Sequence, residues 1–121
     1  MKFDDIYQYF NSPPPNYLNK EVAVCYILAV LLEGESYGTQ LIEQLARDYT
    51  TCRLSDTVLY SALKFLEQEG TIAGYWQKVP GRGRPRRMYY VNEASRSQAE
   101  DLAHLWYSYA LRHRASASQA M

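Results

Sequence analysis

The chain has 121 residues, enough for one domain with its own hydrophobic core, and its 13 basic side chains balance 13 acidic ones. The longest apolar run, residues 22–32, is too short to cross a bilayer, and no signal sequence for secretion opens the chain. These features predict a cytoplasmic protein with no membrane partner.

The neutral total conceals a division of charge along the chain. Residues 1–49 carry seven acidic and three basic side chains, whereas residues 50–91 carry seven basic and three acidic ones. No acidic residue occurs between Gly70 and Asn92. Charge separated in this way within one domain indicates a surface that faces a polyanion.

The start of the chain is expected to form an extension to the domain. Phe3, Ile6, Tyr7 and Phe10 recur at helical spacing, which predicts a short amphipathic helix. The consecutive prolines that follow favour an extended connector, because proline cannot continue a helix. Residues 1–19 are therefore interpreted as a short helix followed by a proline-rich connector.

Two helices are expected next. Residues 20–33 are apolar almost all round, which predicts a buried helix. After a turn, Ser36 is expected to cap a second helix that ends near Tyr49, with Leu41 and Leu45 on its buried side.

A third helix is predicted over residues 55–69. The Ser55 hydroxyl can accept hydrogen bonds from the free amides of the first turn, and Asp56 lies near the positive end of the helix dipole. Gly70 suits a left-handed C-terminal cap. The helix has an apolar stripe and a separate polar face; the polar face comprises Thr57, Tyr60, Ser61 and Lys64.

Two strands and a last helix complete the chain. Residues 71–79 and 86–91 are rich in β-branched and aromatic side chains, and the arginine-rich stretch 79–88 joins them into a hairpin. Asn92 is expected to cap a final helix that ends near Arg114, so residues 92–114 form one unit. Residues 115–121 lack an apolar pattern and are expected to be disordered.

This order of elements predicts an α+β, mainly helical fold. Residues 20–91 would form a winged helix-turn-helix, and residues 92–114 a C-terminal dimerisation helix. In such folds the third helix enters the major groove of double-stranded DNA, and the tip of the hairpin reaches the backbone or the minor groove.

Three stretches of the sequence together resemble one family. They contain the pair Tyr37-Gly38, the run of Leu59, Tyr60, Leu63, Leu66 and Gly70, and the segment Pro85-Arg86-Arg87 followed by Tyr89-Tyr90. In this joint pattern, residues 22–106 resemble the PadR family of bacterial transcriptional regulators. The resemblance implies a homodimer, paired through the last helix with help from the first, that usually represses transcription. Many members have a basic residue at the position of Phe65, so one phosphate contact of the family is not expected here.

The polar face of helix 55–69 is expected to contact base edges or flanking phosphates. The candidate residues on this face and at the start of the helix are Arg53, Ser55, Thr57, Tyr60, Ser61 and Lys64. The structural alternative is that Tyr60 is only half-buried, that Lys64 is a solvated surface charge and that Arg53 belongs to its loop.

The hairpin supplies a second group of candidate DNA contacts: Lys78, Arg82, Arg84, Arg86 and Arg87. The segment Arg82-Gly83-Arg84-Pro85 matches the core of AT-hook peptides, in which glycine lets the backbone lie deep in a narrow A·T-rich minor groove. Because side chains alternate along a strand, Arg86 and Arg87 should point to opposite sides, and Arg86 is the favoured contact. The alternative is that these arginines only keep an exposed hairpin soluble.

Catalytic and metal chemistry find little support in the sequence. Cys25 and Cys52 form no Cys-x-x-Cys pair, which indicates two reduced thiols rather than a metal site. His104 and His113 should lie on opposite sides of the last helix, and the glycines near Arg82 do not match a nucleotide-binding loop. No enzyme activity, cofactor or metal is therefore expected.

The last helix carries an apolar stripe that predicts pairing of two chains. A domain this small should not bury such a stripe alone, so a homodimer with twofold symmetry is expected. The stripe comprises Leu102, Leu105, Trp106 and Tyr109. Two alternatives stay open: a protein–protein adaptor that uses the winged-helix surface, and a repressor gated by a flat small-molecule effector stacked on Trp106 and Tyr109.

Overall fold

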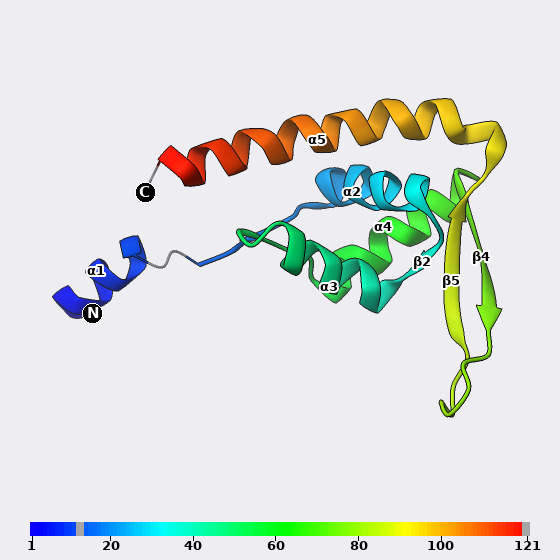
Figure 1. Cartoon of the computed structure of the whole chain (residues 1–121), viewed down its shortest axis with the longest axis horizontal. Coiled ribbons are helices and arrows are strands. Elements are labelled where there is room, and N and C mark those ends of the chain that lie inside the picture. Colours follow the sequence, from blue (N-terminus) through cyan, green and yellow to red (C-terminus); the bar gives the residue numbers. More distant parts are fainter. Residues whose placement is uncertain (12–13, 120–121) are drawn as a thin grey trace.

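The computed structural model describes residues 1–11 and 14–119, with side chains as far as Arg112 in the last helix. Along the chain the elements are α1 (Phe3–Asn11), β1 (Asn16–Tyr17), α2 (Lys20–Glu33), β2 (Ser36–Tyr37), α3 (Gly38–Asp48), β3 (Cys52–Arg53), α4 (Asp56–Gln68), β4 (Ile72–Gln77), β5 (Arg86–Val91), a 3-10 turn η1 (Glu93–Ser95) and α5 (Arg96–Gln119). This is the predicted winged-helix fold with a C-terminal helix (Figure 1). Within the described part of the chain, no helix combines the length and apolarity needed to span a membrane.

Helix α2 forms the centre of the core, as its apolar sequence predicts. The Asn19 side chain caps it by accepting a hydrogen bond from the Val22 amide at 2.9 Å. Its one buried phenol, Tyr26, donates to the Leu41 carbonyl oxygen at 2.7 Å, so this polar group has a partner inside the core. Burial raises the pKa of Tyr26 far above its usual range, which keeps the phenol protonated as a donor. Helix α5 runs along the opposite side of α2 from α3 and α4 (Figure 1).

The start of α3 differs from the prediction. Ser36 does not cap this helix, because its backbone is extended and pairs with Tyr89 of β5 as part of β2. The helix therefore begins one residue later than predicted, at Gly38, and Tyr37 takes the cap position without a side-chain hydrogen bond to the first turn. The Ser36 hydroxyl instead donates to Oε1 of Gln40 at 2.8 Å. Competition from strand pairing, which the local sequence does not reveal, explains the error.

Both ends of α4 follow the prediction. The Ser55 hydroxyl accepts a hydrogen bond from the Val58 amide at 3.2 Å, so the predicted N-terminal cap is confirmed. Gly70 adopts a φ of 76°, the left-handed conformation that favours glycine. The amides of Gly70 and Thr71 bond the carbonyl oxygens of Glu67 and Leu66, both at 3.0 Å, which ends the helix in a Schellman motif.

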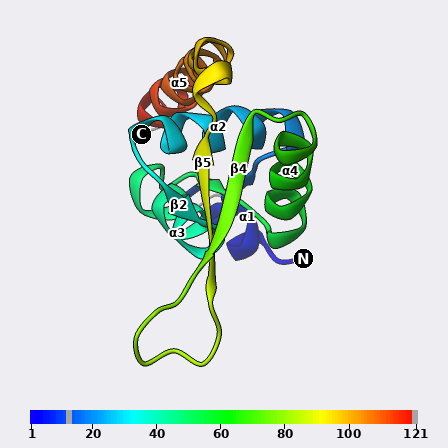
Figure 2. The ribbon, with the colours of Figure 1, turned by 90° about the vertical axis from the view of Figure 1, so that its right-hand side faces the viewer.

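Strands β4 and β5 form the predicted hairpin, and β2 adds a third strand in the order β2-β5-β4. All pairings are antiparallel, with Trp76 opposite Arg87 and Gln77 opposite Arg86. The loop between the two long strands extends beyond the helices (Figure 2). A separate parallel pair joins β1 to β3; both strands have only two residues, too few to leave a pattern in the sequence.

Asn92 does not cap the last helix by its side chain. Its amide group donates to the Gly70 carbonyl oxygen at 2.6 Å, and its backbone amide bonds the Thr71 carbonyl oxygen at 3.0 Å. A short 3-10 turn separates it from α5, which then continues through Gln119. The helix thus extends past its predicted end near Arg114. The expectation that residues 115–121 are disordered stays a prediction, and residues 120–121 lie outside the described residues.

Candidate nucleic-acid interface

Helix α4 presents its polar face to solvent. Its apolar stripe is buried in the core, with Leu59 at 0% and Leu63 at 1% exposure. The predicted DNA contacts Thr57, Tyr60, Ser61 and Lys64 are all exposed. Ser55 is partly buried and its hydroxyl is engaged as the helix cap. The structure thus places four of the six candidates around this helix on one accessible surface.

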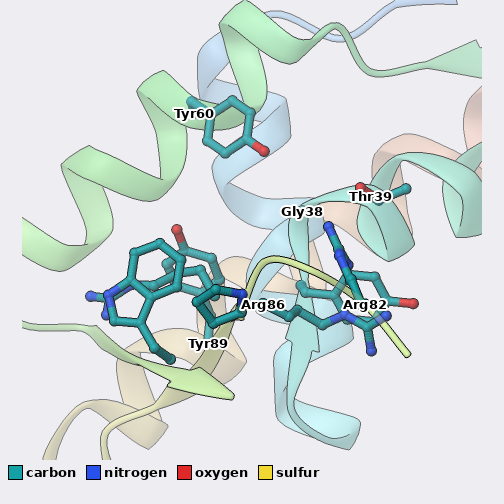
Figure 3. A pocket seen from close by; sticks show the side chains of 10 residues that line it. Gly38, Thr39, Tyr60, Arg82, Arg86 and Tyr89 are labelled. Atoms are coloured by element: carbon teal, nitrogen blue, oxygen red, sulfur yellow. The ribbon is translucent and has the colours of Figure 1, made fainter. Parts of the chain in front are cut away.

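Tyr60 occupies a more particular position than the sequence indicates. Its ring crosses from α4 to the first turn of α3, and it remains 55% exposed. A Cβ atom added to Gly38 would lie 3.0 Å from the Tyr60 hydroxyl oxygen and 3.2 Å from a methyl carbon of Leu59. Glycine at position 38 therefore permits the close approach of the two helices. Figure 3 shows the Tyr60 hydroxyl directed toward Gly38 and Thr39.

The Arg53 side chain makes hydrogen bonds within its own turn. Its Nη1 donates to the carbonyl oxygens of Thr50 and Cys52 at 2.9 and 2.8 Å. These bonds hold the guanidinium at the strand that precedes α4. The structure therefore supports the loop interpretation of Arg53, while leaving its other nitrogen atoms able to donate.

The wing is the loop of residues 78–85 with the adjoining ends of β4 and β5. Lys78, Arg82 and Arg84 are exposed in this loop. Gly81 has a φ of 77°, a left-handed conformation that helps the loop turn between the strands. These three side chains are free to meet a nucleic-acid backbone.

Arg86 and Arg87 point to opposite faces of the sheet, as predicted. The Arg86 guanidinium lies over the Tyr37 ring, 3.8 Å from its centroid. The Arg87 guanidinium lies on the other face, where its Nη2 contacts Oε2 of Glu67 at 3.3 Å. It also lies 5.3 Å from the centroid of the Trp76 ring. Arg87 thus ties the wing to α4, which makes it a poorer candidate for a DNA contact than Arg86.

Gly74 makes room for this placement of Arg87. A Cβ atom at position 74 would lie 2.9 Å from Nε of Arg87 and 3.0 Å from the carbonyl oxygen of Met88. The guanidinium therefore crosses β4 directly above a residue without a side chain. Sequence reasoning assigned no role to Gly74, because a glycine inside a strand reveals nothing of what crosses it.

A hollow of about 310 Å³ lies between the start of α3, α4 and the wing (Figure 3). It is lined by Tyr37, Gly38, Thr39, Tyr60, Trp76, Arg82, Pro85, Arg86, Arg87 and Tyr89. We refer to it below as the wing pocket. Burial raises the pKa of the Tyr89 phenol, and the nearby Glu67 carboxylate raises it further, so this wall of the pocket is uncharged. Tyrosine and arginine residues that are distant in the sequence thus meet at one place.

Lys20 was not among the candidate DNA contacts chosen from the sequence, but it lies beside α4. Its ammonium group lies 5.5 Å from the centroid of the Phe65 ring on α4. Phe65 is 40% exposed, so this cation–π contact brings a positive charge from α2 to the surface of α4. No sequence pattern connects the two residues, which are paired only by the packing of the helices.

Helix α5 buries more of its apolar stripe than predicted. Trp106 is 1% exposed within a single chain, so its assignment to a dimer interface is wrong. Its ring packs between those of Tyr26 and Tyr49, with centroids 5.1 Å away in both cases. Leu102 and Tyr109 are partly buried, whereas Leu105 is 60% exposed. The dimer was predicted because a small domain should not bury the whole apolar stripe of α5 by itself. Leu105 does stay exposed, but the domain buries Trp106 without a second copy.

Both cysteine side chains lie in the core or against it. Cys52 is buried and Cys25 is partly buried, and both are free. Burial raises the pKa of each thiol, which disfavours the nucleophilic thiolate. Among the residues that the structure describes, His, Cys, Asp and Glu side chains form no group of three or more that could hold a metal ion.

Comparisons with known proteins agree with this architecture. The crystal structure of the circadian clock associated protein Pex from Anabaena is 62% identical, with a TM-score of 0.86 over 94% of this chain and 99% of that chain. Pex from Synechococcus is 60% identical, with a TM-score of 0.87 over 90% of this chain and 97% of that chain. A transcriptional regulator from Clostridium thermocellum, 24% identical with a TM-score of 0.62 over 73% of this chain and 85% of that chain, has the same fold. No curated protein sequence matches this chain at a significant level.

The family model for PadR-like transcriptional regulators matches residues 27–101. This range extends from α2 through the wing and into α5, so it includes the polar face of α4 and the arginines of the hairpin. The family binds DNA to regulate transcription and is not an enzyme family. The chain belongs to the PadR-like family of transcriptional regulators and is closely similar to the circadian clock protein Pex.

Proposed function

We propose that the protein is a sequence-specific repressor that binds double-stranded DNA with α4 in the major groove and the wing on the adjacent backbone or minor groove. The observation that carries the proposal is the joint exposure of two surfaces. Thr57, Tyr60 and Lys64 lie free on α4, and Arg82 and Arg84 lie free on the wing. Base edges are read by polar side chains on a recognition helix, and arginines in a hairpin tip neutralise phosphates.

The regulated genes are proposed to belong to a circadian clock. This proposal rests on the two structures described as clock proteins, which cover almost the whole chain at 62% and 60% identity. The protein would act in the cytoplasm of a bacterial cell, at the nucleoid when it is bound to DNA. Mapping of bound DNA across the genome identifies the genes, because the fold alone does not name a target.

Alanine at Tyr60 or at Lys64 should weaken binding to specific DNA without unfolding the domain. A residue that reads base edges contributes about 1–3 kcal/mol, and its loss relaxes specificity at particular base positions. The measurement is a gel shift on duplexes that the protein selects from a random library, with nonspecific DNA as competitor. Ala at Gln68, exposed one turn beyond Lys64, is the control and should bind like the parent. Parental binding by both test variants would exclude α4 as the reading helix, and failure to select any duplex would favour an adaptor.

The proposed active form is a homodimer paired through α5. Leu105 is 60% exposed and Leu111 is 69% exposed on this helix, so apolar side chains remain for a second copy to cover. Two recognition helices related by a twofold axis should address half-sites about 34–36 Å apart. Sedimentation at micromolar concentration should report a dimer with and without DNA. A monomer that binds its selected duplex as a single copy would contradict this expectation.

A further inference from the structure

We propose that a small pocket between α2, α3 and α5 binds the guanidinium group of an arginine side chain that a basic partner protein presents. The pocket has a volume of about 130 Å³, and we refer to it as the aromatic pocket. Four aromatic rings and two carboxylates line it: Tyr26, Tyr49, Trp106, Tyr107, Glu33 and Asp48. None of the candidate DNA contacts is among its lining residues, so this site is separate from the proposed DNA-binding surface.

The rings of the aromatic pocket stand at steep angles to one another. Tyr26 and Tyr49 are inclined by 68° and 75° to the plane of Trp106, and both have their centroids 5.1 Å from it. Tyr26 and Trp106 are each 1% exposed, whereas Tyr107 is 45% exposed. The pocket therefore leads from an exposed ring at the surface to buried rings. Such a set of rings attracts a cation, because the face of each ring is electron-rich.

The charged side chains that line the pocket are all acidic. Of the described residues in its lining, none is basic. Asp48 is paired with Arg47, which lies outside the lining, at 3.1 Å. Glu33, the last residue of α2, is exposed and makes no ion pair with any basic side chain that the structure describes. The Glu33 carboxylate is thus available to an incoming cation.

The negative charge of these carboxylates already reaches the phenols of the pocket. Burial raises the pKa of Tyr107, and the Glu33 carboxylate raises it further. Burial also raises the pKa of Tyr26, with a further contribution from Asp48 that Arg47 opposes. Both phenols therefore stay neutral, in surroundings that disfavour a second negative charge and favour a positive one.

The size and the acceptors of the pocket select a guanidinium group. Its volume of about 130 Å³ is roughly four times the share of one water molecule in the liquid, and it is smaller than the roughly 300–1,000 Å³ of most small-molecule sites. It therefore suits the head of a side chain better than a whole ligand. A guanidinium is planar and weakly hydrated, so it stacks on aromatic rings while its N–H groups donate at the edge. Glu33 and Gln44 supply acceptor oxygens for these donors.

The charge around the pocket indicates that the arginine belongs to a protein surface. Helices α2 and α3 together carry four acidic side chains and two basic ones, so the acidic character extends beyond the pocket. Complementary charge over such an area favours a basic partner and opposes an acidic one. The exposed ring of Tyr107 offers apolar surface for the methylene stem of the same arginine.

A double-mutant cycle between the protein and a peptide tests this contact. Random peptides displayed on phage are selected against the full chain, and the selected peptides should share an arginine. The arginine of the best peptide is then replaced by citrulline, a neutral side chain of the same shape. Citrulline should weaken binding to the parent roughly fivefold more than binding to the Glu33→Gln variant, as expected for a partly exposed ion pair. The indole N–H resonance of Trp106 should shift when the arginine peptide binds, because this ring lies in the pocket.

Two variants control the cycle. Glu43→Gln removes an exposed carboxylate of α3 that does not line the pocket, so citrulline should cost this variant as much as it costs the parent. Tyr107→Ala removes the exposed ring at low risk to the fold and should weaken the arginine peptide more than the citrulline peptide. Failure to select any peptide with arginine, or an equal cost of citrulline in the parent and in Glu33→Gln, would overturn the proposal.

Two further measurements identify the source of the cation. Ethylguanidinium should displace the selected peptide only at concentrations far above that of the peptide itself. Displacement at equal concentration would assign the pocket to a free small cation instead of a partner protein. Sedimentation should give the same self-association for Glu33→Gln as for the parent. Weaker self-association of Glu33→Gln would show that a second copy of this chain fills the pocket, which would likewise overturn the assignment to a partner protein.

Discussion

Alanine in place of Trp106 should lower the free energy of unfolding by about 3–5 kcal/mol, the usual cost of removing a buried tryptophan ring. The ring is 1% exposed and packs against Tyr26 and Tyr49, both at 5.1 Å between centroids. It therefore joins α5 to α2 and to the end of α3. A loss of this size is a large part of the total stability of a domain, so the variant should unfold at a much lower urea concentration.

Leu105→Ala is the matched control for Trp106, since it alters the preceding residue on the same helix. Leu105 is 60% exposed, and a surface substitution of this kind changes stability of the single chain by only about 0.5 kcal/mol. If α5 pairs two copies, Leu105→Ala should instead raise the dissociation constant of the dimer measured by sedimentation. A Trp106→Ala protein as stable as the parent would show that this ring does not hold α5 on the domain.

Changing Arg82 and Arg84 together to alanine should make DNA binding less sensitive to salt. Each phosphate contact adds about 0.9 to the slope of log affinity against log salt concentration, so the double variant should lose roughly two units of slope. Both side chains are exposed in the wing loop on either side of Gly83, so they can reach the same groove. Affinity titrations at several salt concentrations give the slope directly.

The base composition of the flanking DNA separates two ways in which this wing could bind. Contact with phosphates alone should weaken binding equally on all sequences, whereas insertion into the minor groove should make the loss larger beside A·T-rich flanks. Arg47 and Arg96, both exposed and outside the proposed interface, provide a control double variant with the same change in net charge. An unchanged slope in the Arg82/Arg84 variant would mean that the wing is only a solvated hairpin.

The helices, the hairpin and the family were predictable because their signals are local. Ser55 and Gly70 mark the two ends of α4 through capping, and the alternation of β5 places Arg86 and Arg87 on opposite faces. Each of these features depends on residues only a few positions apart. The exposure of Tyr60 and Lys64 on one face of α4 follows from the same helical periodicity.

The errors arose where distant segments compete for the same residue. Ser36 is a good helix cap in isolation, but β5 pairs with its backbone and extends it. Trp106 belongs to an apolar stripe that could face a partner, but α2 and Tyr49 cover it within one chain. The wing pocket could not be foreseen either, since Tyr37, Tyr60 and Arg86 meet only after the sheet and helices have packed.

The two hydrogen bonds of Asn92 connect the end of α4, the helix proposed to read DNA, to the start of α5, the helix proposed to pair two copies. Its side chain holds the Gly70 carbonyl at the end of α4, its backbone holds Thr71, and α5 starts after one short turn. A rotation of α5 about its first turn must therefore carry the end of α4 with it or break these bonds. In a dimer, the angle between the two α5 helices would consequently set the separation of the two recognition helices, and this one asparagine would transmit it.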